Sequence, residues 1–157
     1  MPPKELTDKI VVCDYLFYRL RGESSFNWVR LPLVEIKVRS PNAEYGTIGL
    51  VDSGSDKTFM QKQEADLLGL KPLKWGDEPA MGDAVGAGGE FPCDIMILPE
   101  LQLMKHGVPF CSFRGLNVWV PRTEIAIPYA IIGRDTAFRR FEIAFNEGRK
   151  KVTFKRI

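Results

Sequence analysis

An aspartate directly after an apolar run is the first feature of this chain that could perform chemistry. Residues 47–51 are a candidate buried strand, and Asp52 follows them at once in the sequence Asp52-Ser53-Gly54-Ser55. A carboxylate at the end of a buried strand is destabilising unless hydrogen-bond donors or an opposite charge surround it. The hydroxyl groups of Ser53 and Ser55, and backbone N–H groups in a tight turn at Gly54, are the donors available. This setting suits a carboxyl group that acts in general acid–base catalysis, although an aspartate before Ser-Gly is also a common turn residue.

A second motif lies far downstream, in Tyr129-Ala130-Ile131-Ile132-Gly133-Arg134-Asp135. Together with Asp52-Ser53-Gly54 it resembles the two signatures of the retropepsin-like aspartic proteases, and the resemblance covers roughly residues 45–157. It implies that Asp52 is the catalytic residue and that Ser53, Gly54 and Ser55 form the active-site loop. It also implies that the second signature, Ile131, Ile132 and Gly133, passes close behind this loop.

The resemblance implies further roles for the residues around the loop. Asp56 and Arg134 are expected to form a loop-fixing ion pair with a partly buried guanidinium, because an arginine–carboxylate fork holds a loop well; the alternative is two separate surface charges. Ser53 matches the position whose hydroxyl links two active-site loops across a dimer, and its alternative is a plain flexible turn. We expect the Ser55 hydroxyl to donate to the ionised catalytic pair and to shift activity toward acidic pH.

The chemistry of this family needs two carboxyl groups that share one proton. The chain contains no second Asp-Ser-Gly or Asp-Thr-Gly sequence, and Asp135 follows Gly-Arg, so we expect Asp135 to be structural. A second copy of the chain, related by a two-fold axis, would supply the other Asp52. The sequence therefore predicts a homodimer.

The glycine-rich stretch of residues 79–91 resembles the flap hairpin that closes over substrate in these proteases. A tip with so many glycines has little side-chain packing and is suited to moving. The predicted flap residues are Gly82, Asp83, Ala84, Val85, Gly86, Ala87, Gly88 and Gly89.

Short alternating segments with turn signals predict a mostly β fold. We expect a closed barrel of the acid-protease half-domain type, with one short helix over residues 58–70 and the flap hairpin. Residues 1–27 are predicted to be an N-terminal extension, either strand or short helix, and residues 28–157 the protease domain. The predicted strands are 26–38, 45–51, 95–98 and 101–104 (split at Pro99), 108–120, 125–132, 141–145 and 151–155, with a helical turn at 136–140.

Composition narrows the class of protein. The 157 residues suit one domain, and a hydrophobic content of 45% with a net charge of +2 favours neither nucleic acid nor a membrane as partner. The sequence has one histidine, His106, and three cysteines that lie far apart, Cys13, Cys93 and Cys111, so it lacks the spacing of metal ligands. The odd number of cysteines favours free thiols in a reducing cytosol. The composition therefore favours a cytoplasmic protein without a metal site, and the resemblance implies a peptide or protein substrate and no cofactor.

These observations predict a homodimeric aspartic endopeptidase that activates water between two Asp52 carboxyl groups. One alternative is a catalytically inactive protease-like module for dimerisation or peptide binding. Another is a domain excised from a longer protein.

Overall fold

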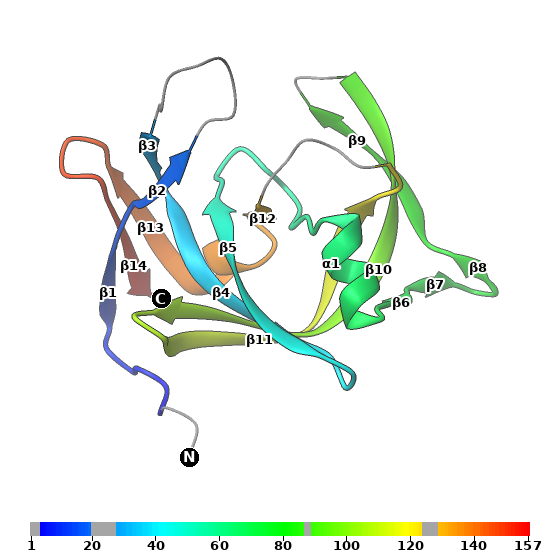
Figure 1. Ribbon diagram of the computed structural model, residues 1–157, viewed down its shortest axis with the longest axis horizontal. Helices are drawn as coiled ribbons and strands as arrows, with labels where there is room; N and C mark the ends of the chain where they lie inside the picture. Colours follow the sequence, from blue (N-terminus) through cyan, green and yellow to red (C-terminus); the bar gives the residue numbers. More distant parts are fainter. Residues whose placement is uncertain (1–3, 20–27, 87–88, 124–128) are drawn as a thin grey trace.

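A seven-stranded sheet forms the centre of the molecule (Figure 1). The computed structural model describes residues 4–19, 28–86, 89–123 and 129–157. The sheet runs in the order β11-β10-β4-β5-β12, and β6 and β9 also pair with β10. Its strands are β4 (Leu33–Arg39), β5 (Glu44–Val51), β6 (Lys71–Pro72), β9 (Met81–Gly86), β10 (Gly89–Lys105), β11 (Val108–Pro121) and β12 (Ala130–Ile132). The mostly β class predicted from alternation is confirmed.

The strand ladder is open rather than a closed barrel, with β11 and β12 at its two ends. Phe59 nevertheless makes an isolated bridge to Trp119 of β11 and another to Ile131 of β12. The backbone N–H of Phe59 donates to the Ile131 carbonyl at 2.9 Å, and the N–H of Trp119 donates to the Thr58 carbonyl at 2.9 Å. A segment that is not itself a strand therefore joins the two edges, which satisfies backbone groups that an exposed edge would leave unpaired.

A second, three-stranded sheet has the order β1-β14-β13, from β1 (Ile10–Asp14), β14 (Lys151–Arg156) and β13 (Phe141–Asn146). The predicted closing hairpin is thus present, and residues 10–14, which the sequence left as strand or helix, are a strand on it. Phe110, Phe141 and Phe154 are fully buried beneath, with ring centroids 5.1–6.0 Å apart. Such aromatic pairs stabilise beyond their buried area. The division at residue 27 stays a prediction.

Two small two-stranded sheets complete the β structure. One is β2 (Leu16–Arg19) with β3 (Trp28–Leu31), and the other is β7 (Lys74–Trp75) with β8 (Glu78–Pro79). The single strand predicted over residues 26–38 is divided into β3 and β4 at Pro32, which has no N–H to donate. The carbonyl of Pro32 accepts from the N–H of Val51 at 3.0 Å instead.

The helix α1 (Lys62–Leu68) lies within the predicted helix but starts later, because residues 58–60 are extended and link β11 with β12. It buries Ala65 and Leu68 and ends at Gly69, whose φ of 62° places it in the left-handed region that favours glycine. The predicted turn at residues 136–140 is the short helix α2 (Ala137–Arg140).

The predicted break at Pro99 is wrong, because β10 continues through it. Before Pro99, β10 pairs with β9 and β6, and after it β10 pairs with β4. Pro99 thus lies where one neighbouring strand gives way to the next, and a missing N–H is tolerated there. Of the strand predicted over 125–132, residues 125–128 lie outside the described part of the chain, and β12 accounts for the end.

Candidate active site

Asp52 lies at the carboxyl end of β5, beside the parallel strand β12. Ile131 is in register with Leu50 and Ile132 with Val51. The backbone N–H of Asp52 donates to the carbonyl of Ile132 at 3.0 Å, which extends this pairing by one residue. The second motif therefore lies directly beside the strand that carries Asp52.

The carboxylate of Asp52 is fixed within a tight turn. Its Oδ1 accepts a hydrogen bond from the backbone N–H of Gly54 at 2.8 Å, and its own carbonyl accepts from the N–H of Ser55 at 3.3 Å. An aspartate that accepts from the backbone two residues on is a recurrent turn device. Asp52 is half-buried, whereas Ser53 and Gly54 are exposed. One oxygen of the carboxylate is thus held by the loop, and the group remains partly accessible to solvent.

The hydroxyl of Ser55 has a different partner from the one expected. It donates to the carbonyl of Lys57 at 2.7 Å. A serine hydroxyl has one proton to donate, so in this chain it closes the loop on itself and is not a donor to the Asp52 carboxylate. The predicted influence of Ser55 on the ionised pair is therefore wrong.

Gly133 lies against the back of this loop with no space for a side chain. A Cβ atom there would lie 2.2 Å from the carbonyl oxygen of Lys57 and 2.9 Å from that of Ser55. The backbone N–H of Arg134 donates to the Ser55 carbonyl at 2.8 Å. The two motifs are thus in direct backbone contact, and the absence of a side chain at residue 133 permits it.

Two buried threonines hold the loop and the second motif together, and sequence reasoning did not identify them. Thr58 and Thr136 are 1% and 2% exposed. Thr58 Oγ1 accepts from the N–H of Gly133 at 3.1 Å and donates to Asp135 Oδ1 at 2.8 Å. Thr136 Oγ1 donates to the carbonyl of Gly133 at 3.1 Å. The side chain of Asp135 is therefore held behind the loop by its hydrogen bond from Thr58.

Asp56 and Arg134 form an ion pair at the surface. Their side chains are 72% and 57% exposed, so the expected partial burial of the guanidinium is wrong. Exposed pairs contribute little because water screens the charges and both side chains lose freedom. The hydrogen bond from the backbone N–H of Arg134 to the Ser55 carbonyl therefore links the two motifs independently of this exposed ion pair.

The predicted flap is a hairpin of β9 and the start of β10, with Ala84 in register with Phe91 and Gly82 with Cys93. Its base packs on Trp119, since a Cβ at Gly82 would lie 2.2 Å from the ring of that residue. Further out, Val85 is 82% exposed. Residues 87–88 of the predicted flap lie outside the described residues.

Two tyrosines that contact each other were not among the predicted site residues. Tyr129, just before β12, meets Tyr18 of β2 edge to face, with ring centroids 5.5 Å apart and planes at 82°. Burial raises the pKa of the Tyr129 phenol, and Tyr18 and the carboxylate of Asp52 add smaller effects in the same direction. Tyr129 stood in the second motif, but its partner comes from the opposite end of the chain, which no local pattern indicates.

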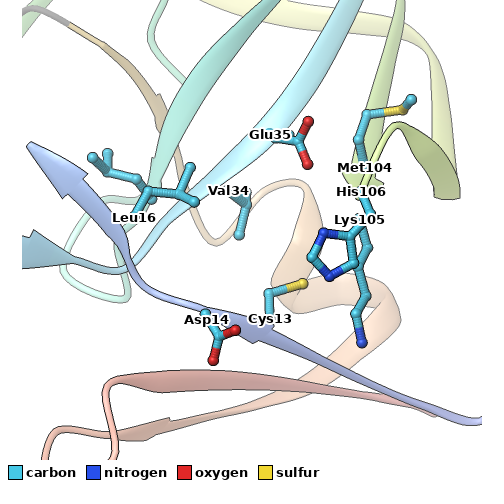
Figure 2. A pocket seen from close by; sticks show the side chains of 9 residues that line it. Cys13, Asp14, Leu16, Val34, Glu35, Met104, Lys105 and His106 are labelled. Carbon is cyan, nitrogen blue, oxygen red and sulfur yellow. The ribbon is translucent and has the colours of Figure 1, made fainter.

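A separate pocket lies between β1, β4 and the turn from β10 to β11 (Figure 2). It contains Cys13 and the single histidine, His106, with Glu35 and Lys105 among its other lining residues. Burial raises the pKa of the Cys13 thiol to about 11, so the thiol is protonated at neutral pH. A protonated thiol is a poor nucleophile, and none of the predicted site residues lines this pocket.

In the described part of the chain, no three His, Cys, Asp or Glu side chains are grouped as a metal site would need. Within the same residues, neither helix has the length and apolar character to cross a membrane.

Comparisons with known proteins give one kind of match. No family model matches the sequence, and no curated protein matches it. Among solved structures, the chain is similar to the crystal structure of a retropepsin-like aspartic protease from Rickettsia conorii. The identity is 12% over 96% of this chain and 95% of that chain, with a TM-score of 0.49.

Proposed function

We propose that this chain is an aspartic endopeptidase that acts as a homodimer, with one Asp52 from each copy. The observation that carries the proposal is the position of Asp52 at the end of β5, in a loop pinned from behind by the second motif. The carboxylate accepts a hydrogen bond from the N–H of Gly54, and the lack of a side chain at Gly133 lets the backbone of the second motif contact the loop. A loop braced in this way suits a group that must keep its geometry during a reaction.

The proposed reaction uses general acid–base catalysis by two carboxyl groups that share one proton. The ionised carboxylate takes a proton from a water molecule, whose oxygen attacks the scissile carbonyl carbon. The protonated carboxyl gives its proton to the carbonyl oxygen. The tetrahedral intermediate then collapses and the peptide C–N bond breaks. The leaving nitrogen takes the proton that the first carboxylate took from water, and the second carboxylate takes a proton from a hydroxyl of the intermediate, which restores the singly protonated pair. The hairpin of β9 and β10 is the proposed flap that closes over the peptide.

The alternative of a peptide-binding or dimerisation module has a weaker basis in the site. A module of this kind has no need of an ionisable group at the centre of its binding surface. Asp52 is only half-buried, and its second carboxylate oxygen is not used by the hydrogen bond from Gly54. This leaves an oxygen for a water molecule or a second carboxyl group, as the proposed reaction requires.

The test is cleavage of a peptide library by the wild-type chain and by Asp52→Asn. Asp66→Asn is a matched control, because Asp66 is an exposed aspartate on α1. We expect cleavage by the wild type and the control, and loss of essentially all cleavage by Asp52→Asn with an unchanged melting temperature. Undiminished cleavage by folded Asp52→Asn would refute the mechanism. Binding of peptides without cleavage by the wild type would favour the alternative.

A further inference from the structure

The hairpin of β9 and β10 leaves the seven-stranded sheet at one definite level. Below this level β10 lies between two strands, since Asp94 is in register with Met81 of β9 and with Val120 of β11. β11 ends at Pro121, and beyond it residues 89–92 of β10 pair with β9 alone among the described residues. Figure 1 shows this part of the hairpin extending past the rest of the sheet. The end of β11 is therefore the level at which the hairpin can bend.

Arg122 is the first residue after β11, and it contacts both strands of the hairpin at this level. Its backbone N–H donates to the carbonyl of Pro92 at 3.1 Å, which continues the pairing with β10 by one residue. Its side chain returns to the same strand, where Nε lies 3.0 Å and Nη2 2.9 Å from Oδ1 of Asp94. The guanidinium also contacts the sulfur of Met81 on β9. One residue thus holds the hairpin where it leaves the sheet.

The ion pair of Arg122 and Asp94 is strong enough to bias a mobile hairpin but too weak to decide the fold. The two side chains are 44% and 32% exposed. Pairs that are open to water shift an equilibrium by up to about fivefold, and added salt weakens them. Cys93 and Ile95 are buried and keep the base of the hairpin folded, whereas Val85 further out is exposed. The position of the outer hairpin is therefore the property that this pair can change.

We propose that Arg122 is a positioning residue that clamps the base of the flap through Asp94, so that peptide binding depends on ionic strength. When the ion pair is formed, the hairpin is held near the position from which it closes, and the peptide has less of it to order. When salt or a substitution breaks the pair, the hairpin samples more positions and the peptide binds more weakly. The inference rests on the proposed endopeptidase function and adds to it a residue outside the glycine-rich stretch.

Hydrogen exchange tests the clamp without any cleavage. The backbone amides of β9 are followed in the wild type, in Arg122→Gln and in Asp94→Asn, each of which removes one charge and keeps a polar side chain. The combination of Arg122→Glu with Asp94→Arg restores an ion pair with the charges exchanged. Lys62→Gln is the matched control, because Lys62 forms an exposed ion pair with Asp66 on α1, outside the hairpin.

Each single substitution should speed exchange in β9 roughly two- to fivefold, the range of an ion pair open to water. Arg122→Gln combined with Asp94→Asn should be no faster than either alone, because both remove the same interaction. The exchanged pair should return the rate toward that of the wild type, and Lys62→Gln should leave it unchanged. Wild-type exchange in folded Arg122→Gln and Asp94→Asn would overturn the inference alone. If one of these two variants does not fold, the other decides.

KM and kcat for an uncharged peptide are then measured at low and high salt, at protein concentrations where light scattering shows the same oligomer throughout. For the wild type, high salt should raise KM severalfold with a smaller change in kcat. Arg122→Gln should have the higher KM at both salt concentrations. A wild-type KM that ignores salt and equals that of Arg122→Gln would overturn the role of the clamp in binding. A wild-type chain that cleaves no peptide would overturn the proposed function, whereas exchange would still decide whether Arg122 holds the hairpin.

Discussion

Gly133 and Lys57 approach each other so closely that a methyl group on residue 133 would lie 2.2 Å from the Lys57 carbonyl oxygen. The same methyl group would also lie 2.9 Å from the carbonyl oxygen of Ser55. Both obstructing groups are backbone, so neither can rotate aside. The loop that carries Asp52 therefore depends on a glycine far away in the sequence for its position.

The substitution Gly133→Ala should accordingly destabilise the fold and abolish cleavage. Overpacking commonly lowers the free energy of unfolding by about 1–3 kcal/mol, and we expect the upper end because backbone must move. Chemical denaturation measures the change. Gly148→Ala is the control, since a Cβ there has an ordinary contact at 3.5 Å with Asn146. A Gly133→Ala protein as stable and active as wild type would show that the two segments do not touch in solution.

The ion pair of Asp56 and Arg134 should contribute little to stability. A double-mutant cycle with Asp56→Ala and Arg134→Ala should give a coupling energy of about 0.2–1 kcal/mol, the range of exposed pairs. The hydrogen bond from the backbone N–H of Arg134 to the Ser55 carbonyl survives both substitutions. Thermal or urea denaturation at low and high salt measures the coupling, which should weaken with salt. A coupling of several kcal/mol would mean that the pair is buried, for example in a dimer.

Glu64 on α1 should make stability depend on pH. Its pKa is raised by burial, against a smaller opposite effect of the hydrogen bond from Thr47. Its Oε2 atom is buried with no hydrogen-bond partner among the described residues. The folded chain therefore binds this proton more tightly than the unfolded chain. The free energy of unfolding falls as pH rises from the ordinary glutamate pKa through the raised one.

Glu64→Gln cannot ionise, so it should remove this fall and raise the free energy of unfolding at neutral pH by about 1 kcal/mol. Urea denaturation across the acidic to neutral range measures both effects. Glu78→Gln on β8 is the control, because Glu78 is exposed. A Glu64→Gln protein with the same pH dependence as wild type would show that this carboxyl is not protonated preferentially in the fold.

The flap should matter for turnover and not for folding. Val85 is 82% exposed, so Val85→Ser should change the free energy of unfolding by no more than about 0.5 kcal/mol. If the flap closes over the peptide, the same change should lower kcat/KM severalfold, because an apolar contact with bound substrate is lost. Val29→Ser is a contrasting variant, since Val29 is partly buried and should lose stability as well. Equal activity of Val85→Ser and wild type would count against a closing role.

Local patterns predicted the elements whose structure depends on near neighbours. The strand before Asp52, the closing hairpin of β13 and β14, and the helix α1 follow from alternation, turn residues and helix formers within short windows. Pro99 was misjudged because its effect depends on which strands lie on either side of β10. A single strand was predicted across Pro32 because its alternation continued through a residue that cannot donate a ladder bond.

The site was predictable only as far as its motifs reach. Asp52 and the second motif were identified by residue type and order, and the structure places them side by side. The hydroxyl of Ser55 was assigned to the wrong partner because loop geometry, and not sequence, decides which acceptor it meets. Thr58 and Tyr18 were missed because their partners, Gly133 and Tyr129, are distant in the chain.

Subunit mixing tests the shared carboxyl pair most directly. Wild-type chain is mixed with increasing excess of Asp52→Asn, and exchange of subunits is verified by co-purification of differently tagged chains. Cleavage per wild-type chain should fall toward zero, because a mixed dimer has only one Asp52 carboxyl group in its site. Such a site has no second Asp52 carboxyl group with which to share a proton. Mixing with Asp66→Asn should cause no such fall. Full activity per wild-type chain in the presence of excess, exchanged Asp52→Asn would contradict a site built from two copies of Asp52.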